Sequence, residues 1–392
     1  MKIIKTLSLF AAAAWSISLT AQEKTNKKES QIKFTVVKEM QCTSVKDQFH
    51  SGTCWIFSTE SFLESEFMRM GKGQVDLSEM WIVRAGYIEK AKKYMRMMGK
   101  TNFGPGGEAI DVINLSAQYG IVPQSAYPGL PEGETKIRHG ELDEVLKAIL
   151  DAQLKLTEGK LSPNWLMVFT AALDAYLGAP VTTFNVNGKS YTPQTYAAFL
   201  GFNAADYVPV TSFTHHPFYS QFVLEVPDNW AWYNYYNVPM EDMMSIINNA
   251  TMNGYTVGWG ADVSEPYFSY KNGMAIVPEK EMADMSQGEK DSLWLVPSKD
   301  KLITQLLRQQ AFDDLSTQDD HGMQITGQAK DQTGKKYYII KNSWGTTRNE
   351  LGGYFYASEN YIAYKTTSIL VHKSAIPADI AGKMGIVQKM NR

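Results

Sequence analysis

The stretch Asp47–Phe57, DQFHSGTCWIF, places one of only two cysteines in the chain directly before a run of large apolar residues. Apolar side chains then recur at helical spacing, on Ile56, Leu63, Phe67 and Met70. The pattern predicts an amphipathic helix that begins at Cys54 and stops before Gly71. A thiol at a helix N-terminus, next to an imidazolium, has a lowered pKa and becomes a nucleophile. We therefore expect Cys54 to be catalytic.

Composition limits the class of protein. The chain has 392 residues, of which 44% are hydrophobic and 20% are charged, so it can bury a large core in two or three domains or lobes. Its formal net charge of -3 gives no basic field, which argues against a nucleic-acid partner. Beyond residue 22 the sequence contains no long uncharged apolar run of the kind that spans a membrane.

The first residues resemble a secretory signal. Lys2 and Lys5 precede an apolar stretch over 7–19, and a small residue, Ala21, closes it. We predict that residues 1–21 are removed and that the mature protein is exported, to the periplasm or the medium, without stable membrane insertion. Residues 22–33 are polar and charged and are expected to form a linker.

The other cysteine, Cys42, lies twelve residues before Cys54. A disulfide between the two would silence Cys54 as a nucleophile. We expect Cys42 to be a small buried apolar residue instead, and the alternative of a redox switch stays open.

The order of expected elements is helices first and strands last. Helices are predicted over 54–70, 77–99, 106–120, 141–157, 163–177 and 240–254. Strands are predicted over 34–40 and 255–263, with one hairpin over 181–193 and another over 321–345. This arrangement favours an α+β protein with segregated lobes.

The final hairpin carries a partner for the thiol. His321 opens one strand, and Asn342 ends the returning strand, so both fall at the same end of the ladder. The Asn342 carbonyl can accept the imidazole N–H while the other ring nitrogen faces Cys54. Trp344 can cover that hydrogen bond. Gln48 can offer its amide, beside the Cys54 backbone N–H, to the oxyanion of an acyl-transfer intermediate.

The remaining histidines suggest no second site. His215 and His216 are adjacent, but the sequence shows no further ligand at the spacing of a zinc site. His50 is expected on a surface loop. We predict no metal and no organic cofactor.

Three motifs occur in a fixed order: Gln48-x5-Cys54-Trp55, the DHGM at 320–323 and the NSWG at 342–345. Together with LSE at 77–79 and a Gly106-Gly107 pair before a helix, they resemble the papain-like cysteine peptidases. Cys54 and His321 are 267 residues apart, against roughly 130–150 in a compact papain domain, so an insertion is expected. The intervening segments resemble those of bleomycin hydrolase and bacterial aminopeptidase C.

The resemblance implies a papain-like two-lobed fold with an insertion. It divides residues 34–377 into a helical lobe over about 34–139, an insertion over about 140–237 and a β-rich lobe over about 238–377, followed by a tail over 378–392. It also implies a Cys54-His321-Asn342 triad, an oxyanion hole with Gln48, and backbone pairing of peptide substrates with Gly106 and Gly107.

Aminopeptidase activity and a homo-hexamer are typical of these relatives, whose chain end enters the cleft and meets the substrate amine. The tail here lacks the family's usual closing residues and carries a net positive charge. An endopeptidase or dipeptidyl-type peptidase is therefore the first alternative. A peptide-binding homologue without turnover is the second.

Overall fold

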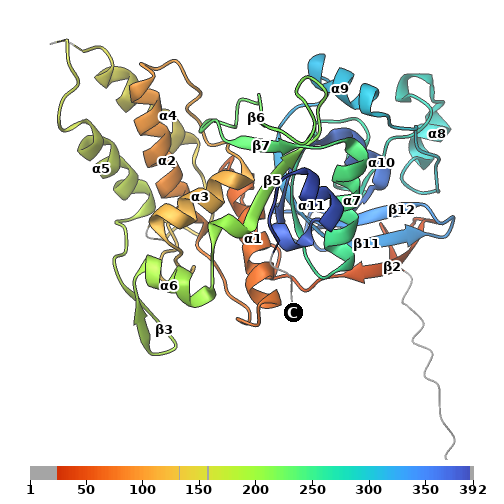
Figure 1. Cartoon of the computed structure of the whole chain (residues 1–392), viewed down its shortest axis with the longest axis horizontal. Coiled ribbons are helices and arrows are strands. Elements are labelled where there is room, and N and C mark those ends of the chain that lie inside the picture. The colour runs from red at the N-terminus through yellow and green to blue at the C-terminus, as the bar shows by residue number, and fades with distance from the viewer. Residues whose placement is uncertain (1–23, 132, 157–158, 389–392) are drawn as a thin grey trace, which may run out of the picture.

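The computed structural model describes residues 24–131, 133–156 and 159–388. Helices gather on one side of the molecule and a large sheet lies on the other, with helix α1 (Cys54–Arg69) between them (Figure 1). The expected α+β, two-lobed, papain-like fold is confirmed. The proposed signal peptide lies outside the described residues. None of the described helices combines the length and the apolar character that a bilayer crossing requires.

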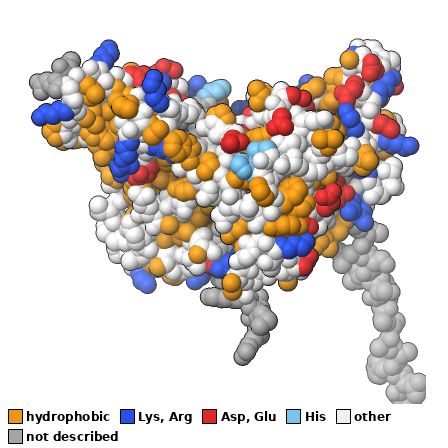
Figure 2. Space-filling model, turned by 45° about the horizontal axis from the view of Figure 1, so that its top comes forward, with side chains coloured by type: hydrophobic (Ala, Val, Ile, Leu, Met, Phe, Trp, Pro, Cys, Tyr) orange, Lys and Arg blue, Asp and Glu red, His pale blue; other side chains and the backbone are white. Residues whose placement is uncertain are grey.

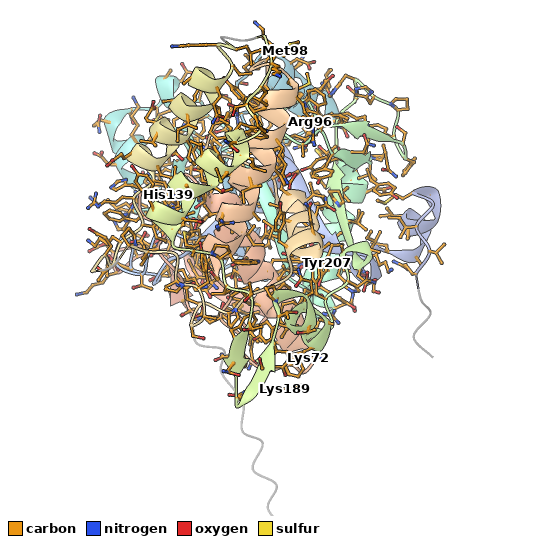
Figure 3. All side chains as sticks on the ribbon, turned by 90° about the vertical axis from the view of Figure 1, so that its left-hand side faces the viewer. Lys72, Arg96, Met98, His139, Lys189 and Tyr207 are labelled. Carbon is orange, nitrogen blue, oxygen red and sulfur yellow. The ribbon has the colours of Figure 1, made fainter. Side chains whose placement is uncertain are left out.

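The helical lobe has one continuous apolar core. Its helices, after α1, are α2 (Glu79–Arg96), α3 (Ala109–Tyr119), α4 (Gly140–Gln153), α5 (Trp165–Leu177) and α6 (Pro193–Leu200). A short hairpin, β3 (Phe184–Val186) and β4 (Lys189–Tyr191), turns at Asn187 and Gly188, both at positive φ. Figure 3 shows Lys189 on this hairpin at one end of the lobe and Met98, after α2, at the other.

The β-rich lobe is built on one mixed sheet, in the order β6-β7-β5-β14-β8-β11-β12-β13-β10-β9. These strands are β5 (Tyr207–Thr211), β6 (Gln221–Val223), β7 (Asn234–Asn237), β8 (Val257–Ala261), β9 (Phe268–Ser269), β10 (Met274–Ala275), β11 (His321–Asp331), β12 (Lys336–Lys341), β13 (Tyr354–Ser358) and β14 (Thr366–His372). Two N-terminal strands, β1 (Lys24–Thr25) and β2 (Lys33–Glu39), join through the pairing of β2 with β11.

Short helices cover this sheet. They are α7 (Met240–Met252), α8 (Gln287–Ser292), α9 (Gln305–Asp313), α10 (Glu359–Lys365) and α11 (Ala378–Lys383), with single 3-10 turns at Ala204–Asp206, Met282–Asp284 and Lys373–Ala375. The C-terminal segment is part of the lobe, because Ile380, Ala381 and Met384 are buried in its core. Gln388 donates to the carbonyls of Lys373 and Ile376, at the end of β14.

The domain boundaries differ from those expected. Strand β2 was assigned to the helical lobe, yet it pairs with β11 in the sheet. The segment 140–237 is not a separate unit, because α4 to α6 share the helical core while β5 to β7 extend the sheet. The described part of the polar linker is packed as well: the side chains of Asn26 and Ile32 are buried. The charged residues in these segments face solvent, and because they dominate the sequence there, the buried residues between them were not predicted.

The lobes meet along α1 and the hairpin of β11 and β12. Gln324 on β11 accepts a hydrogen bond from Ser61 on α1 at 2.7 Å and donates to Ser65 at 2.9 Å. Lys341 on β12 donates to Ser61 at 2.6 Å. Buried polar contacts of this kind are directional, so they set the register of the helix against the sheet. The register places the start of α1 beside the start of β11.

Candidate active site

Cys54 is the first residue of α1, and its local geometry leaves the helix end open. Gly52 adopts a φ of 63°, and a side chain there would strike the ring of Pro105 at 2.7 Å. The Thr53 hydroxyl lies 2.6 Å from that of Ser51 and makes no cap to the helix. The first backbone N–H groups of α1 therefore remain available to a negative charge beside the partly exposed Cys54.

His321 and Asn342 face each other across the ends of β11 and β12. The His321 Nε2 atom lies 2.7 Å from the Asn342 Oδ1 atom, which also accepts the backbone N–H of Ser343 at 2.7 Å. Because Oδ1 acts as the acceptor for both, Nε2 carries the ring proton and Nδ1 is the free base. The Trp344 ring lies 4.6 Å from the imidazole, centroid to centroid, and covers it as expected.

The structure brings Cys54 and His321 into one cavity. The sulfur accepts the backbone N–H of Gly322, the residue next to His321. A side chain at position 322 would come within 2.8 Å of the Ser58 hydroxyl and 3.1 Å of the Trp55 Cα atom. Because position 322 is a glycine, the first residues of strand β11 can lie close to the first turn of α1.

Burial acts on both reacting groups. It raises the pKa of the Cys54 thiol to about 12, against the lowering effect of the N–H groups of Gly322 and Trp55. It lowers the pKa of His321 to about 4, against the hydrogen bond that the imidazole donates to Asn342. Both directions favour a neutral thiol beside a neutral imidazole. This differs from the lowered thiol pKa that the helix start suggested, because loss of water outweighs the N–H groups.

Gln48 contacts the segment that follows Asn342 in the other lobe. Its backbone N–H donates to the Ser343 carbonyl at 2.9 Å, and its Oε1 accepts the Ser343 hydroxyl at 2.6 Å. Asp47 and Trp344 form an isolated antiparallel β-bridge. With Oε1 occupied, the Gln48 amide nitrogen is the group that can donate to a ligand.

The Gly106-Gly107 pair lies against two side chains that demand glycine. A side chain on Gly107 would meet the Trp55 indole at 2.7 Å, and that indole is fixed by donation to the Pro105 carbonyl at 2.8 Å. On Gly106, the Cβ position lies within 2.1 Å of the Asp228 carboxylate. The buried ammonium of Lys90 donates to the carbonyl of Gly106, so this carbonyl is already used within the protein.

Sequence reasoning missed three carboxylates that line the cavity of Cys54 and His321: Glu108, Asp228 and Asp319. Glu108 directly follows the glycine pair, and Asp319 lies two residues before His321, so a search of positions flanking the motifs could have found both. Asp228 is about ninety residues or more from either motif. No local signal marks it.

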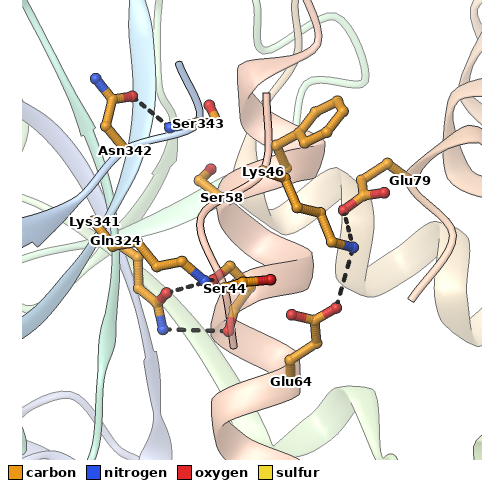
Figure 4. A pocket seen from close by; sticks show the side chains of 11 residues that line it. Ser44, Lys46, Ser58, Glu64, Glu79, Gln324, Lys341, Asn342 and Ser343 are labelled. Atoms are coloured by element: carbon orange, nitrogen blue, oxygen red, sulfur yellow. Dashed lines mark hydrogen bonds and ion pairs between the residues drawn. The ribbon is translucent and has the colours of Figure 1, made fainter. Parts of the chain in front are cut away.

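A different charged cluster lines a second cavity, which Asn342 also lines (Figure 4). There, the Lys46 ammonium lies 2.5 Å from Glu79, 3.4 Å from Glu64 and 2.7 Å from Asp76. The Glu64 and Glu79 side chains are 1% and 5% exposed. This cluster ties the segment before α1 to the second half of α1 and to the start of α2.

The remaining candidates lie elsewhere. His215, His216 and Glu225 come close enough together to hold a metal ion, and Glu225 is a carboxylate that the sequence did not point to. His215 already contacts Gln309 at 3.1 Å and Glu225 at 3.3 Å through its two ring nitrogens. Acidic and basic side chains are interspersed on the face in Figure 2, with histidines among them.

His50 is exposed, as expected. Cys42 and Cys54 are both free thiols. Cys42 is partly buried beside Ser65, whose hydroxyl lies 3.5 Å from its sulfur, and burial raises the pKa of its thiol. The two sulfurs therefore have separate surroundings.

Comparison with known proteins agrees with this arrangement. Residues 183–388 match the model of the peptidase C1-like family, and residues 31–133 match that of the papain family cysteine proteases. The chain is 23% identical to aminopeptidase C of Streptococcus thermophilus, over 86% of this chain and 81% of that protein. It is 25% identical to aminopeptidase W of Lactobacillus delbrueckii subsp. lactis, over 87% and 84%.

A solved structure, that of pepw from Lactobacillus rhamnosis, superimposes with a TM-score of 0.70 at 20% identity. The match covers 90% of this chain and 84% of the other. The likeness extends over both lobes, so the fold is shared along most of the chain.

Proposed function

The chain belongs to the peptidase C1-like family and is a cysteine-type peptidase, and from this premise we propose that it is an aminopeptidase acting through Cys54, His321 and Asn342. The observation that carries the proposal is the hydrogen bond of 2.7 Å from His321 Nε2 to Asn342, in the cavity that also holds Cys54. It leaves Nδ1 as the base on the side of the thiol.

The reaction begins with a proton transfer from the Cys54 thiol to Nδ1 of His321. The sulfur attacks the carbonyl carbon of the scissile peptide, and the oxyanion accepts hydrogen bonds from the Gln48 amide and the Cys54 backbone N–H. The imidazolium then gives its proton to the departing amine. Water attacks the thioester after losing a proton to the same nitrogen, and the carboxylate product leaves as the thiol re-forms.

The burial of the pair supports this order of events. Since neither Cys54 nor His321 favours its charged form alone, the proton moves when substrate excludes water and supplies the oxyanion. Asn342 stabilises the imidazolium that forms, because it accepts the Nε2 proton in both states. Asn342 thus acts as a positioning residue.

Labelling and hydrolysis test the catalytic assignment. A thiol-reactive epoxide is expected to modify Cys54 and abolish hydrolysis of unblocked peptides, whereas the Cys54→Ala variant is neither labelled at this site nor active. The Cys42→Ala variant is the matched control and should keep both properties. Absence of labelling and of hydrolysis under reducing conditions would instead favour a peptide-binding homologue.

An endopeptidase or dipeptidyl-type peptidase is the second candidate. It is favoured by the described part of the tail, because residues 378–388 pack against the end of β14 and supply no lining residue to the cavity of Cys54. Equal cleavage of N-acetylated and free peptides would favour this candidate over an aminopeptidase.

Export and assembly complete the proposal. We propose that residues 1–21 direct secretion, on the basis of their composition, and that the enzyme forms the hexamer typical of its relatives. N-terminal sequencing of protein from the periplasm or medium should begin at Gln22. Light scattering on the purified protein should give six times the mass of one chain.

A further inference from the structure

The cavity that Cys54 and His321 line is small, and much of its wall is acidic. Its volume is about 20 Å³, enough for one group the size of a water molecule. Its acidic lining residues are Glu108, Asp228, Asp319 and Asp320. Among the lining residues that the structure describes there is no lysine or arginine. The pocket therefore concentrates negative potential at a place where only a small group fits.

One of these side chains is buried with an unused acceptor. Glu108 is 3% exposed, and its Oε2 atom accepts the Tyr235 hydroxyl at 2.9 Å and that of Ser368 at 3.3 Å. Its Oε1 atom is buried and, when the neighbouring Asp319 is ionised, has no hydrogen-bond donor. An acceptor isolated in this way is unfavourable unless a donor is brought to it.

The neighbouring carboxylates differ in what they already bind. Asp320 accepts the backbone N–H groups of Val263 and Ser264, at 2.9 and 3.0 Å, and thus serves the loop after β8. Asp319 accepts the Thr367 hydroxyl at 3.1 Å through one oxygen and lies against Glu108. Asp228 packs its carboxylate on the Cα atom of Gly106.

Burial, and to a smaller extent the neighbouring charges, shift the pKa values of the carboxylates in the pocket. Burial and the Asp319 carboxylate raise the pKa of Asp228 to about 6, although Lys90 acts against them. Burial likewise raises the pKa of Glu108, and burial and Glu108 raise that of Asp319. Two of the three N–H groups of the Lys90 ammonium are used in donation to the carbonyls of Gly104 and Gly106, and Lys90 does not line the pocket.

We propose that Glu108, Asp228 and Asp319 bind the N-terminal ammonium of the peptide substrate. An ammonium brings three N–H donors and one positive charge to a pocket with acceptors and no cation in its described lining. Asp228 and Asp319 also act electrostatically on the Cys54 thiol, so the bound ammonium lies near the reacting sulfur. The inference rests on the proposed peptidase function and gives the cleft its selectivity for free N-termini.

The size of the pocket favours the substrate's own terminus over a lysine side chain. A lysine would have to bring four methylene groups with its ammonium, whereas the N-terminal ammonium enters alone, ahead of the backbone. The relatives' device, a carboxylate at the chain end, is not needed in this scheme. The described part of the tail contributes nothing to the pocket lining.

Binding to an inactive enzyme tests the proposal without turnover. The probes are tetra-alanine with a fluorophore on its C-terminal end, with either a free or an acetylated N-terminus. Cys54→Ala protein should bind the free form at least ten times more tightly. Adding Asp228→Asn or Glu108→Gln should reduce that ratio to near one, whereas adding Asp242→Asn, at a carboxylate bonded to Tyr219 on another face, should preserve it.

Several results would overturn the inference. An unchanged ratio in the folded Asp228→Asn protein would exclude a role for this carboxylate. Since Asp228 is partly exposed, the Asp228→Asn variant should fold even if the Glu108→Gln variant does not. Loss of the ratio on truncation after Gln388 would assign the ammonium to the chain end. Tight binding of N-acetylated peptides with a lysine would assign the pocket to a side chain, and loss of the ratio in EDTA would assign it to a metal ion.

Failure of the peptidase proposal gives a different pattern. The unmodified enzyme would then hydrolyse neither peptide, yet Cys54→Ala protein would still prefer the free terminus. Conversely, hydrolysis of free and acetylated peptides at equal kcat/KM in unmodified enzyme would leave the chemistry in place and remove the ammonium site.

Discussion

Two acidic clusters adjoin the junction between α1 and the sheet, and they are built differently. In the cluster beside Asn342, the ammonium of Lys46 forms ion pairs with both Glu64 and Glu79. In the cleft, Glu108, Asp228 and Asp319 line a pocket whose described walls hold no cation. The first set of carboxylates therefore has a cation within the protein, and the second set has none in the described lining of its pocket. This difference is what we expect if the second set binds a cationic ligand. We call the first the rear cluster, which joins parts of the helical lobe, and the second the front cluster, which is the proposed substrate site.

Removal of the rear cation should have the largest effect on stability. Lys46→Met leaves Glu64 and Glu79 buried without their partner, and breaking such a pair costs about 3–5 kcal/mol of unfolding free energy. Urea denaturation followed by fluorescence measures this loss. Lys336→Met is the matched control, because Lys336 is exposed and its partner Glu359 is only partly buried, and it should change stability by less than about 1 kcal/mol.

The second variant Glu79→Gln sharpens the same comparison. In the Lys46→Met background it removes one of the uncompensated charges, so it should restore part of the lost stability. If Lys46→Met were as stable as the unmodified protein, the rear carboxylates would be protonated without help, and the contrast between the two clusters would disappear.

The two glycines of the cleft should respond differently to alanine. Gly107→Ala meets the Trp55 indole, which is anchored to Pro105, so we expect a loss of about 1–3 kcal/mol in unfolding free energy. Gly106→Ala meets the Asp228 carboxylate, whose partly exposed side chain can move aside.

We therefore expect Gly106→Ala to retain most of its stability but to raise KM for peptides with a free N-terminus. Denaturation curves and steady-state kinetics on both variants measure the two effects. Equal stability losses, with KM unchanged in Gly106→Ala, would mean that the position of Asp228 does not matter for substrate binding.

The sequence predicted the parts of this site that are local or adjacent to a motif. The helix after Cys54 follows from apolar spacing, and the contact of His321 with Asn342 follows from one hairpin of known length. The carboxylate of Asp228 could not be predicted, because its place depends on how the segment between β6 and β7 folds over Gly106. Nor could the raised pKa of Cys54, since the depth of the cleft is a property of both lobes.

The same limit explains the domain boundaries. Helix periodicity located α4 and α5 closely, but it carries no information about which core each helix joins. Strands of three to five residues, such as β5 to β7, are too short to show a clear alternation, and β5 is buried throughout. Their membership of the main sheet is therefore visible only in the structure.

The front cluster should make kcat/KM fall at acid pH in a way that depends on the substrate. Binding of an ammonium requires Asp228 to be ionised, and its pKa is about 6. Below that pH, kcat/KM for free peptides should fall by about tenfold per pH unit. The groups that act on Asp228 or feel its charge are Lys90, Glu108, Asp111, Asp319 and Cys54.

The acid limb of His321 should lie lower, near its pKa of about 4, because protonation there removes the base that accepts the thiol proton. A pH profile of kcat/KM with Asp228→Asn, compared with the unmodified enzyme, separates the two. The variant should keep the lower limb and lose the upper one. An upper limb that persists in the variant belongs to another of the neighbouring groups.

The smallest expected effect is on the free energy of unfolding, because the carboxylate of Asp228 in the front cluster is ionised without a cation of its own. A carboxyl group whose pKa is raised in the folded state binds its proton more tightly there than in the unfolded chain, so ionisation destabilises the fold as the pH rises through about 6. Asp228→Asn removes that charge and should stabilise the protein by about 1 kcal/mol at pH 8 and by much less at pH 4. Thermal unfolding at both pH values measures the difference, with Asp242→Asn as control. The same substitution should lower activity on peptides with a free N-terminus. A gain in stability together with a loss of binding is what we expect of a site that has no cation of its own and binds one from the substrate. A loss of stability at pH 8 would instead mean that Asp228 already has its partners within the protein.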